Sequence, residues 1–382
     1  MKIAIVAEGF RPYVGGVETR YTKLAEKLAR RHDVEVVTLI QNNRPTTGEN
    51  VPENEVWGRV RVFRVRVQGE YFLEDGTRSL KGVREFAKRC AEKLRGSDYD
   101  VVLVSEWPLL HIPYIKRGAR HPIVIDWHEV WGTYYWRFGL KGVGGFLLER
   151  AIARLKGVRH VAVSEFTRNR LRKMLGVRGE IPVIWNGVDP EEYRGVSNVE
   201  REYGKILFFG RFAPHKGIDL LVEAFKEVKR SVKDASLHII GDGPLRSFVE
   251  SISSKVDGVN VHLALPRKEL LKHIASSWVA AIPSSREGQG ISYLEAMMAG
   301  TPVVSIKSEH NAFSSMVRDG VEALIADPNP RALAASILRL LRDDGLWRSL
   351  SENGKVFASR FDWEKISLEL ERVLKDAAGE GG

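Results

Sequence analysis

The sequence predicts an α/β protein made of two doubly wound, Rossmann-like domains that face a cleft. Short apolar runs alternate with amphipathic stretches along the whole chain, which is the pattern of a parallel sheet covered by helices. The pattern starts again after residue 204, and 382 residues are too many for one ordinary core. Several runs are almost continuously apolar, as strands buried on both faces must be.

The first half contains seven strand candidates separated by helical patterns. Residues 17–31 place apolar side chains on one helical face, and residues 78–95 form an amphipathic helix with a cationic outer face. The strands are expected at residues 2–7, 34–40, 60–67, 101–105, 122–127, 160–164 and 182–185. These elements are expected to build a first domain over residues 1–187.

The second half repeats this alternation. Residues 186–204 have low hydrophobicity and contain a proline and three glycines, so we interpret them as a linker. A second domain is expected at residues 188–362, and a final helix over 361–378 is expected to return, so that 363–382 packs on the first domain. The strands are expected at residues 205–210, 236–241, 259–263, 279–283, 302–306 and 322–326.

Composition is typical of a soluble globular protein, with 43% hydrophobic and 28% charged residues and no apolar run of 18 residues. The single Cys90 excludes an internal disulfide framework and a multi-cysteine metal site, which fits a reducing cytoplasm. The N-terminal MKIAIVAEG is interpreted as a first strand and not as a signal peptide. Only three glutamines among many lysines, arginines and glutamates suggest a thermophile.

The net charge of +10 predicts an acidic partner, unless it reflects only a well-solvated surface. The sequence has no zinc-finger spacing and no RNP-like aromatic strand, so nucleic acid is not expected as a partner. A phosphorylated substrate and an anionic membrane surface remain. Residues 131–150 crowd aromatic, leucine and basic residues with glycines, which suits an interfacial segment; core packing with a solvated face is the alternative.

Two carboxylates in SSREGQGISYLEAMMAGTPVV, residues 284–304, are candidates for ligand binding. Glu287 lies in a loop that leaves the C-terminal end of a buried strand, where ligands bind to doubly wound sheets. Glu295 lies one turn into a helix expected over 292–299, and Gly290 allows backbone N–H groups to approach an anion. Acids for hydroxyl groups beside donors for phosphate indicate a sugar-nucleotide site, unless both acids are solvated helix-end charges.

Cationic and glycine-rich loops follow two further strands. GRFAPHKG places Arg211 and Lys216 beside a strand end, where both can converge on one diphosphate, unless they are ordinary surface charges. Gly15 and Gly16 follow the first strand and can bring backbone amides to the same diphosphate. Asp98 and Asp100 are interpreted as a turn, and since no other residues have metal-ligand spacing, no metal is expected: the two cations replace it.

The motifs, in this order, resemble the retaining glycosyltransferases of family four, which have the GT-B fold. The resemblance covers essentially the whole chain, and it is specific where an E-x7-E element occurs together with an R-x4-K element. These elements lie at residues 287–295 and 211–216; the weaker matches are GGVE (15–18), WHEVW (127–131), VSEFTR (163–168), NGVD (186–189) and GDGP (241–244).

The resemblance implies a nucleotide-sugar donor bound by the second domain, an acceptor on the side of the first domain, and transfer with retention of the anomeric configuration. It assigns Arg211 and Lys216 to the leaving diphosphate, where negative charge develops, and His128 to the sugar and acceptor. The remaining implied donor contacts are Glu287 on sugar hydroxyls, Glu295 on the ribose, and Gly15, Gly16, Gly290 and Ile291. Gln289 departs from the family, which often has an aromatic residue there, so both UDP-sugars and GDP-mannose stay open as donors.

The expected enzyme moves a sugar from a nucleotide diphosphate to a hydroxyl group of a glycan or a polyprenyl or other lipid-linked acceptor, with no cofactor. It is expected in the cytoplasm, and on the membrane face if residues 131–150 bind lipid. The alternatives are a nucleotide-sugar epimerase on the same fold, a disaccharide synthase with a soluble acceptor, and a binding module without turnover.

Overall fold

The chain divides into two compact units, which are Met1–Trp185 with Trp363–Gly382, and Asn186–Asp362. The computed structural model describes residues 1–41, 51–73, 77–118, 120–263 and 265–380. The boundary expected from the sequence at 187/188 lies two residues beyond this division. Positions 381–382 of the expected terminal segment lie outside the described residues.

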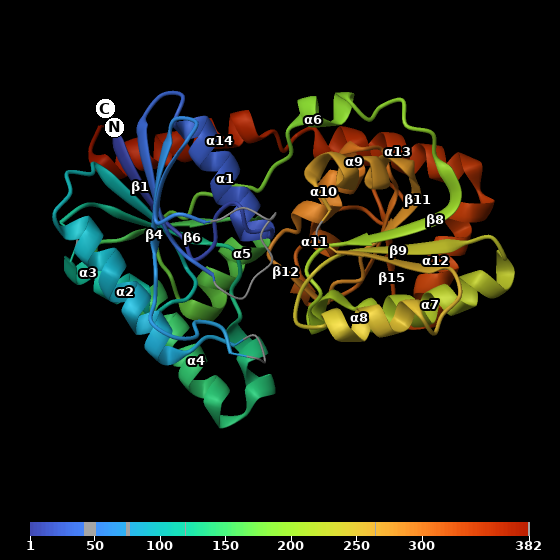
Figure 1. Ribbon diagram of the computed structural model, residues 1–382, viewed down its shortest axis with the longest axis horizontal. Helices are drawn as coiled ribbons and strands as arrows, with labels where there is room; N and C mark the ends of the chain where they lie inside the picture. The colour runs from blue at the N-terminus through green and yellow to red at the C-terminus, as the bar shows by residue number, and fades with distance from the viewer. Residues whose placement is uncertain (42–50, 74–76, 119, 264, 381–382) are drawn as a thin grey trace. The chain divides into compact units, whose positions relative to one another are not determined.

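The first unit is built around a mainly parallel sheet (Figure 1). Its strands are β1 (Lys2–Val6), β2 (Asp33–Leu39), β3 (Asn54–Trp57), β4 (Val60–Val65), β5 (Val101–Ser105), β6 (Ile123–Trp127) and β7 (Arg159–Ala162). Within the described chain the order is β3-β4-β2-β1-β5-β6-β7, and β3 is antiparallel to its neighbour β4. The other strands follow the Rossmann order, with a topological switch point between β1 and β5.

Helices of the first unit bury apolar faces against this sheet. One helix carries an apolar side chain at every third or fourth position, and these side chains join the core: Val83, Phe86, Cys90 and Leu94. The helices are α1 (Gly16–Leu28), α2 (Leu80–Arg95), α3 (His111–Gly118), α4 (Leu140–Ala153), α5 (Glu165–Arg170) and α14 (Trp363–Ala378), with a 3₁₀ helix η1 (Gly132–Phe138) and a π-helical turn η2 (Leu171–Leu175).

The C-terminal helix α14 belongs to the first unit, although it follows the second unit in sequence. Trp363 is buried, and Glu371 accepts a hydrogen bond from Nε of Arg31 at 2.6 Å. Burial of an aromatic residue together with a charged contact fixes the returning helix on α1 and the residues that follow it.

The second unit repeats the Rossmann order. Its strands are β8 (Glu202–Phe209), β9 (Ser236–Gly241), β10 (Val259–Leu263), β11 (Ser277–Ala281), β13 (Val303–Ile306) and β15 (Leu324–Ala326), and two short strands, β12 (Arg286–Glu287) and β14 (His310–Asn311), pair separately. In the described residues the parallel sheet runs β10-β9-β8-β11-β13-β15. The switch point therefore lies between β8 and β11.

The helices of the second unit cover its sheet and share its core. Phe208, Phe225 and Leu237, from a helix and two strands, are among its fully buried members. The helices are α6 (Pro190–Arg194), η3 (Pro214–Lys216, 3₁₀), α7 (Ile218–Ser231), α8 (Arg246–Ser253), α9 (Arg267–Ser276), α10 (Ile291–Met298), α11 (Phe313–Met316), α12 (Pro330–Arg342) and α13 (Asp344–Ala358). Among the described residues, none of the helices of either unit is long and apolar enough to cross a membrane.

Two expectations about local structure are wrong. Residues 186–204 are not a linker, because they form α6 and the start of β8, and the Val188 N–H donates to the Phe361 carbonyl at 2.7 Å. The expected strand at 182–185 is reduced to one bridge between Ala162 and Val183. Pro182 has no N–H group to extend the ladder.

Candidate functional site

Two loops meet at the carboxyl end of the switch point of the second unit. The loop after β8 carries Arg211 and η3, and the loop after β11 leads to Glu287. The backbone N–H and the hydroxyl of Ser285 both donate to the carbonyl of His215, at 2.8 and 3.2 Å. Gly217 has φ 68°, and a Cβ there would lie 2.5 Å from the carbonyl oxygen of Pro283, so this close approach requires glycine.

Lys216 and Glu287 come together in this loop pair. Nζ of Lys216 lies 2.5 Å from Oε1 of Glu287, and the two side chains are 16% and 10% exposed. Mutual neutralisation lets both charged groups remain largely buried. Lys216, which is predicted to bind phosphate, and Glu287, which is predicted to bind sugar hydroxyl groups, therefore lie side by side in the fold.

Positive charge is concentrated around His215. Burial is the main cause that lowers the pKa of His215 to about 2, and the charges of Lys216, Arg286 and Arg211 lower it further. Arg211 is exposed. The sequence analysis missed Arg286, although it directly precedes Glu287 in the candidate loop. A group of cations at a strand end creates a field that attracts anions.

The helix α10 begins immediately after the loop of Glu287. Gly290 has φ 85°, and a Cβ there would lie 2.4 Å from the ring of Tyr293, so a side chain does not fit. Ile291 is the first helical residue and is half-buried. The helix starts and ends one residue earlier than the expected 292–299.

Glu295 is buried one turn into α10 and forms an ion pair with Arg267 at the start of α9. Nη2 of Arg267 also lies 2.9 Å from a carboxylate oxygen of Glu192 and 3.3 Å from the hydroxyl of Tyr193. Sequence reasoning missed Arg267 because it is 28 positions from Glu295. The interpretation of Glu295 as a solvated helix-end charge is wrong, because the side chain lies within this network.

Gln289, which departs from the family pattern, holds the backbone of Asn186 through two hydrogen bonds. Its side-chain oxygen accepts from the Asn186 N–H at 2.5 Å, and its amide nitrogen donates to the Asn186 carbonyl at 3.0 Å. The side chain is buried, so both backbone groups are satisfied away from water. An aromatic residue lacks this donor and acceptor pair, which explains why an amide is accommodated here.

In the first unit, His128 follows β6 and lies near Tyr21 of α1. The Tyr21 hydroxyl is 2.9 Å from Nε2 of His128. Burial is the main cause that lowers the pKa of His128 to about 4, while the charge of Asp126 acts in the opposite direction. The ring is therefore neutral at neutral pH and is oriented by a hydroxyl group.

Glu106 is a further acid of this region that sequence reasoning missed. It follows β5, and Oε1 accepts from the N–H groups of His128 and Glu129 at 2.9 and 3.0 Å. Burial raises the pKa of Glu106, and its other oxygen has no hydrogen-bond partner within the described structure. Its position directly after an apolar strand at the switch point was the signal that could have identified it.

A buried ion pair between Arg20 of α1 and Asp126 of β6 stabilises the carboxyl end of the first sheet. Nε and Nη2 of Arg20 donate to the two carboxylate oxygens of Asp126 at 2.8 and 3.0 Å, and both side chains are fully buried. Nη1 of Arg20 donates to the Trp185 carbonyl at 2.9 Å. Burial alone would raise the pKa of Asp126, but the Arg20 charge holds it below its usual value.

Gly15 and Gly16 lie where predicted, at the start of α1 after β1. A Cβ on Gly15 would lie 2.2 Å from a carboxylate oxygen of Glu18, whereas a Cβ on Gly16 would meet nothing within 4 Å. Glu18 is buried against this loop. A side chain at position 15 would therefore require Glu18 to move, whereas a side chain at position 16 would meet open space.

Asp98 and Asp100 lie at the opposite, amino-terminal edge of the first sheet. Asp98 pairs with the Lys2 side chain, and Asp100 accepts from the Lys2 N–H at 2.6 Å. Both acids therefore contact Lys2, the first residue of β1.

Comparisons with known proteins agree with this architecture. Residues 189–357 match the model of glycosyl transferases group 1, and residues 14–192 match that of glycosyltransferase family 4. An uncharacterised glycosyltransferase of Methanocaldococcus jannaschii is 31% identical over 70% of this chain and 69% of its own length. The phosphatidyl-myo-inositol mannosyltransferase of Mycobacterium tuberculosis is 29% identical over 100% of this chain and 98% of its own.

Solved structures share the fold at low identity. A sucrose-phosphate synthase from Thermosynechococcus elongatus superposes with a TM-score of 0.82 at 19% identity, over 98% of both chains. Anabaena HepE in complex with UDP-glucose gives a TM-score of 0.74 at 19% identity, over 98% of this chain and 100% of its own. With its two Rossmann-like units and these family matches, the chain belongs to the group 1, family 4 glycosyltransferases of the GT-B fold.

Proposed function

We propose that this glycosyltransferase moves a hexose from a nucleotide diphosphate to a lipid-linked acceptor hydroxyl, with retention and without a metal ion. The contact between Lys216 and Glu287 at the switch point carries the proposal. It joins a cation suited to a leaving diphosphate with an acid suited to sugar hydroxyl groups. Arg211 and Arg286 extend the positive charge around the same point.

The proposed chemistry uses these residues to stabilise the leaving group. The bond between the anomeric carbon and the phosphate oxygen breaks, and the acceptor oxygen forms the new bond on the same face. The departing phosphate takes the acceptor proton. Lys216 and Arg211 bind the charge that develops on this phosphate, and Glu287 and Glu295 accept hydrogen bonds from sugar and ribose hydroxyl groups.

His128 acts in this proposal as a neutral hydrogen-bonding group. Its low pKa and its contact with Tyr21 do not suit a group that must gain a proton at neutral pH. Glu106 accepts hydrogen bonds from the backbone N–H groups of His128 and Glu129, and so positions the backbone that carries the ring.

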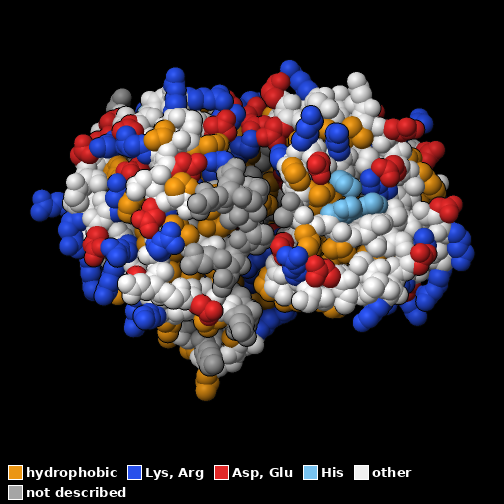
Figure 2. All heavy atoms as spheres, viewed as in Figure 1, with side chains coloured by type: hydrophobic (Ala, Val, Ile, Leu, Met, Phe, Trp, Pro, Cys, Tyr) orange, Lys and Arg blue, Asp and Glu red, His pale blue; other side chains and the backbone are white. Residues whose placement is uncertain are grey.

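A lipid-linked acceptor is supported by a hydrophobic surface on η1 and α4. Trp136, Phe138, Leu140 and Leu147 are exposed, with Leu140 92% accessible. Hydrophobic side chains are visible at the end of the first unit where α4 lies (Figure 2). Arg137 and Arg150 lie on the same two helices, which is the combination that interfacial helices use on anionic bilayers. The mannosyltransferase relative named for phosphatidyl-myo-inositol favours the same acceptor class.

A transfer assay tests the proposed function. The chain is incubated with radiolabelled GDP-mannose or UDP-glucose, and with phosphatidylinositol, a polyprenyl phosphate or a soluble sugar as acceptor. We expect label in a lipid product whose anomeric configuration, read by NMR, matches the donor. Transfer only to the soluble sugar would instead indicate a disaccharide synthase. Epimerised donor in the absence of an acceptor would indicate an epimerase.

The hydrophobic surface on η1 and α4 leads to a separate prediction about membrane binding. The double variant Phe138→Gln/Leu140→Gln is expected to float with anionic liposomes at least about tenfold less than the unchanged chain, because each buried apolar side chain contributes about 1.5–3 kcal/mol. Val356→Gln is the matched control, since Val356 is 60% exposed on α13 of the other unit. Equal flotation of the double variant and the unchanged chain would contradict the assignment.

A further inference from the structure

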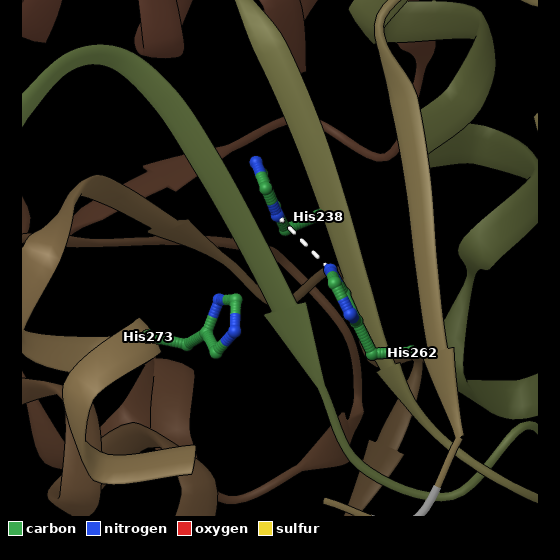
Figure 3. Close-up of side chains that lie close together, drawn as sticks. All are labelled: His238, His262 and His273. Atoms are coloured by element: carbon green, nitrogen blue, oxygen red, sulfur yellow. Dashed lines mark hydrogen bonds between the residues drawn. The ribbon is translucent and has the colours of Figure 1, made fainter. Parts of the chain in front are cut away.

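Three histidines of the second unit, none of them among the predicted ligand-binding residues, lie close together (Figure 3). His238 lies on β9, His262 on β10 and His273 on α9. Among the described residues, their candidate ligand nitrogens all lie within 4.8 Å of one another. Histidine side chains also reach the visible surface of this unit (Figure 2).

The sheet register accounts for this arrangement. His238 pairs with Asn260 in the parallel ladder, so His262, two residues further along β10, points to the same face. The rings of His238 and His262 stack at an interplanar angle of 5°. His273 approaches this face from α9, with its ring centroid 4.8 Å from that of His262.

The nitrogens of His238 and His262 lie within hydrogen-bonding distance of each other, and the same spacing fits two ligands of one metal ion. Nδ1 of His238 and Nε2 of His262 are 3.3 Å apart. Zinc–nitrogen bonds of about 2.0–2.1 Å in a tetrahedron place two ligand nitrogens about 3.3–3.4 Å apart. The His273 ring would have to move inward by about 1–2 Å to complete the same geometry.

The third histidine offers a nitrogen that the protein leaves unused. Nδ1 of His273 is buried and has no hydrogen-bond partner in the described structure. A buried ring nitrogen without a partner is costly, and a metal ion or an ordered water molecule satisfies it.

Neighbouring charges are balanced and leave the site accessible. Nζ of Lys205 lies 2.6 Å from Glu202 Oε1 and 2.7 Å from the Ser276 hydroxyl. The carboxylate offsets the nearby positive charge, which by itself would oppose a cation. The histidines are half-buried, and this leaves a path for an ion and a water ligand.

We propose that His238, His262 and His273 bind a divalent transition-metal ion, zinc in the first instance, with water as the fourth ligand. Three imidazoles are a ligand set that zinc commonly accepts. The ion would cross-link α9 to β9 and β10. Because α9 begins at Arg267, which pairs with Glu295, the ion would also hold that arginine in place. The site would act structurally and take no part in glycosyl transfer.

The test uses the full chain, purified without a polyhistidine tag and stripped with a chelator. Zinc binding is measured by calorimetry, and cobalt substitution by visible absorption. We expect one zinc per chain and a cobalt spectrum typical of nitrogen ligands. At 100 times its dissociation constant, zinc should raise the folded-to-unfolded ratio about 100-fold. Binding weaker than millimolar, or a cobalt spectrum equal to that of free cobalt, would overturn the site.

Variants locate the bound ion. His262→Gln and His273→Gln should each weaken zinc binding by more than about 100-fold, since even residues that only orient a ligand are worth 10–100-fold. His121→Gln, in the first unit, is the matched control and should bind as the unchanged chain does. Equal affinity of all three variants would place the ion elsewhere. Should either cluster variant fail to fold, the cobalt spectrum of the unchanged chain still decides.

Discussion

Replacing Lys216 by methionine is expected to lower kcat/KM for the nucleotide sugar by about 100- to 1,000-fold. Loss of one preorganised group that stabilises transition-state charge has an effect of this size. Methionine keeps much of the length and apolar volume of lysine but removes its charge. The measurement is initial-rate kinetics with the donor and acceptor that the transfer assay identifies.

Two further variants distinguish the effect of losing charge at the site from the effect of losing charge elsewhere on the surface. Lys226→Met removes an exposed lysine of α7 that pairs with Glu223, and should leave kcat/KM within twofold. Glu287→Gln should also reduce activity, and the double variant with Lys216→Met should lose less than the product of the two losses, because the groups touch. A loss below tenfold for Lys216→Met would remove this residue from the mechanism.

Arg20→Met is expected to reduce the free energy of unfolding of the first unit by about 3–5 kcal/mol. The variant leaves Asp126 buried without its two hydrogen bonds, which is the costly way to break a buried ion pair. The Trp185 carbonyl also loses its donor. Native-state hydrogen exchange in β1 and β6 measures the loss in this unit separately from the other.

A second substitution distinguishes the unpaired charge from lost packing. Arg20→Met/Asp126→Leu should recover most of the lost stability, because it leaves no uncompensated carboxylate. Arg84→Met, at an exposed position of α2, should change stability by less than about 0.5 kcal/mol. If the double variant were as unstable as Arg20→Met, packing of the arginine stem would be the cause.

The fold was predictable because its strands are continuously apolar. Runs such as those of β1 and β5 can be buried on both faces only in a covered parallel sheet. The prediction of a linker was wrong because low hydrophobicity is not by itself a sign of irregular structure. Residues 186–204 are polar, but Tyr193 and backbone hydrogen bonds fix them to the second unit.

The loop residues near strand ends could be identified from the sequence, whereas their partners could not. The sequence placed Lys216 and Glu287 each in a loop after a strand, and the structure brings the two side chains together. Arg267 and Glu106 act through contacts across 28 and 22 positions that only the tertiary fold creates. The histidine cluster also depends on strand register, since no short-range spacing links its members.

We propose that cations of the second unit hold the donor by its diphosphate, and one binding measurement tests this directly. Isothermal titration compares GDP and UDP with guanosine and uridine, for the unchanged chain and for Arg211→Met/Lys216→Met. We expect one diphosphate to bind at least about 100-fold tighter than its nucleoside, equivalent to about 2.7 kcal/mol, and the double variant to lose this difference. Unchanged diphosphate affinity in the double variant would contradict the proposal.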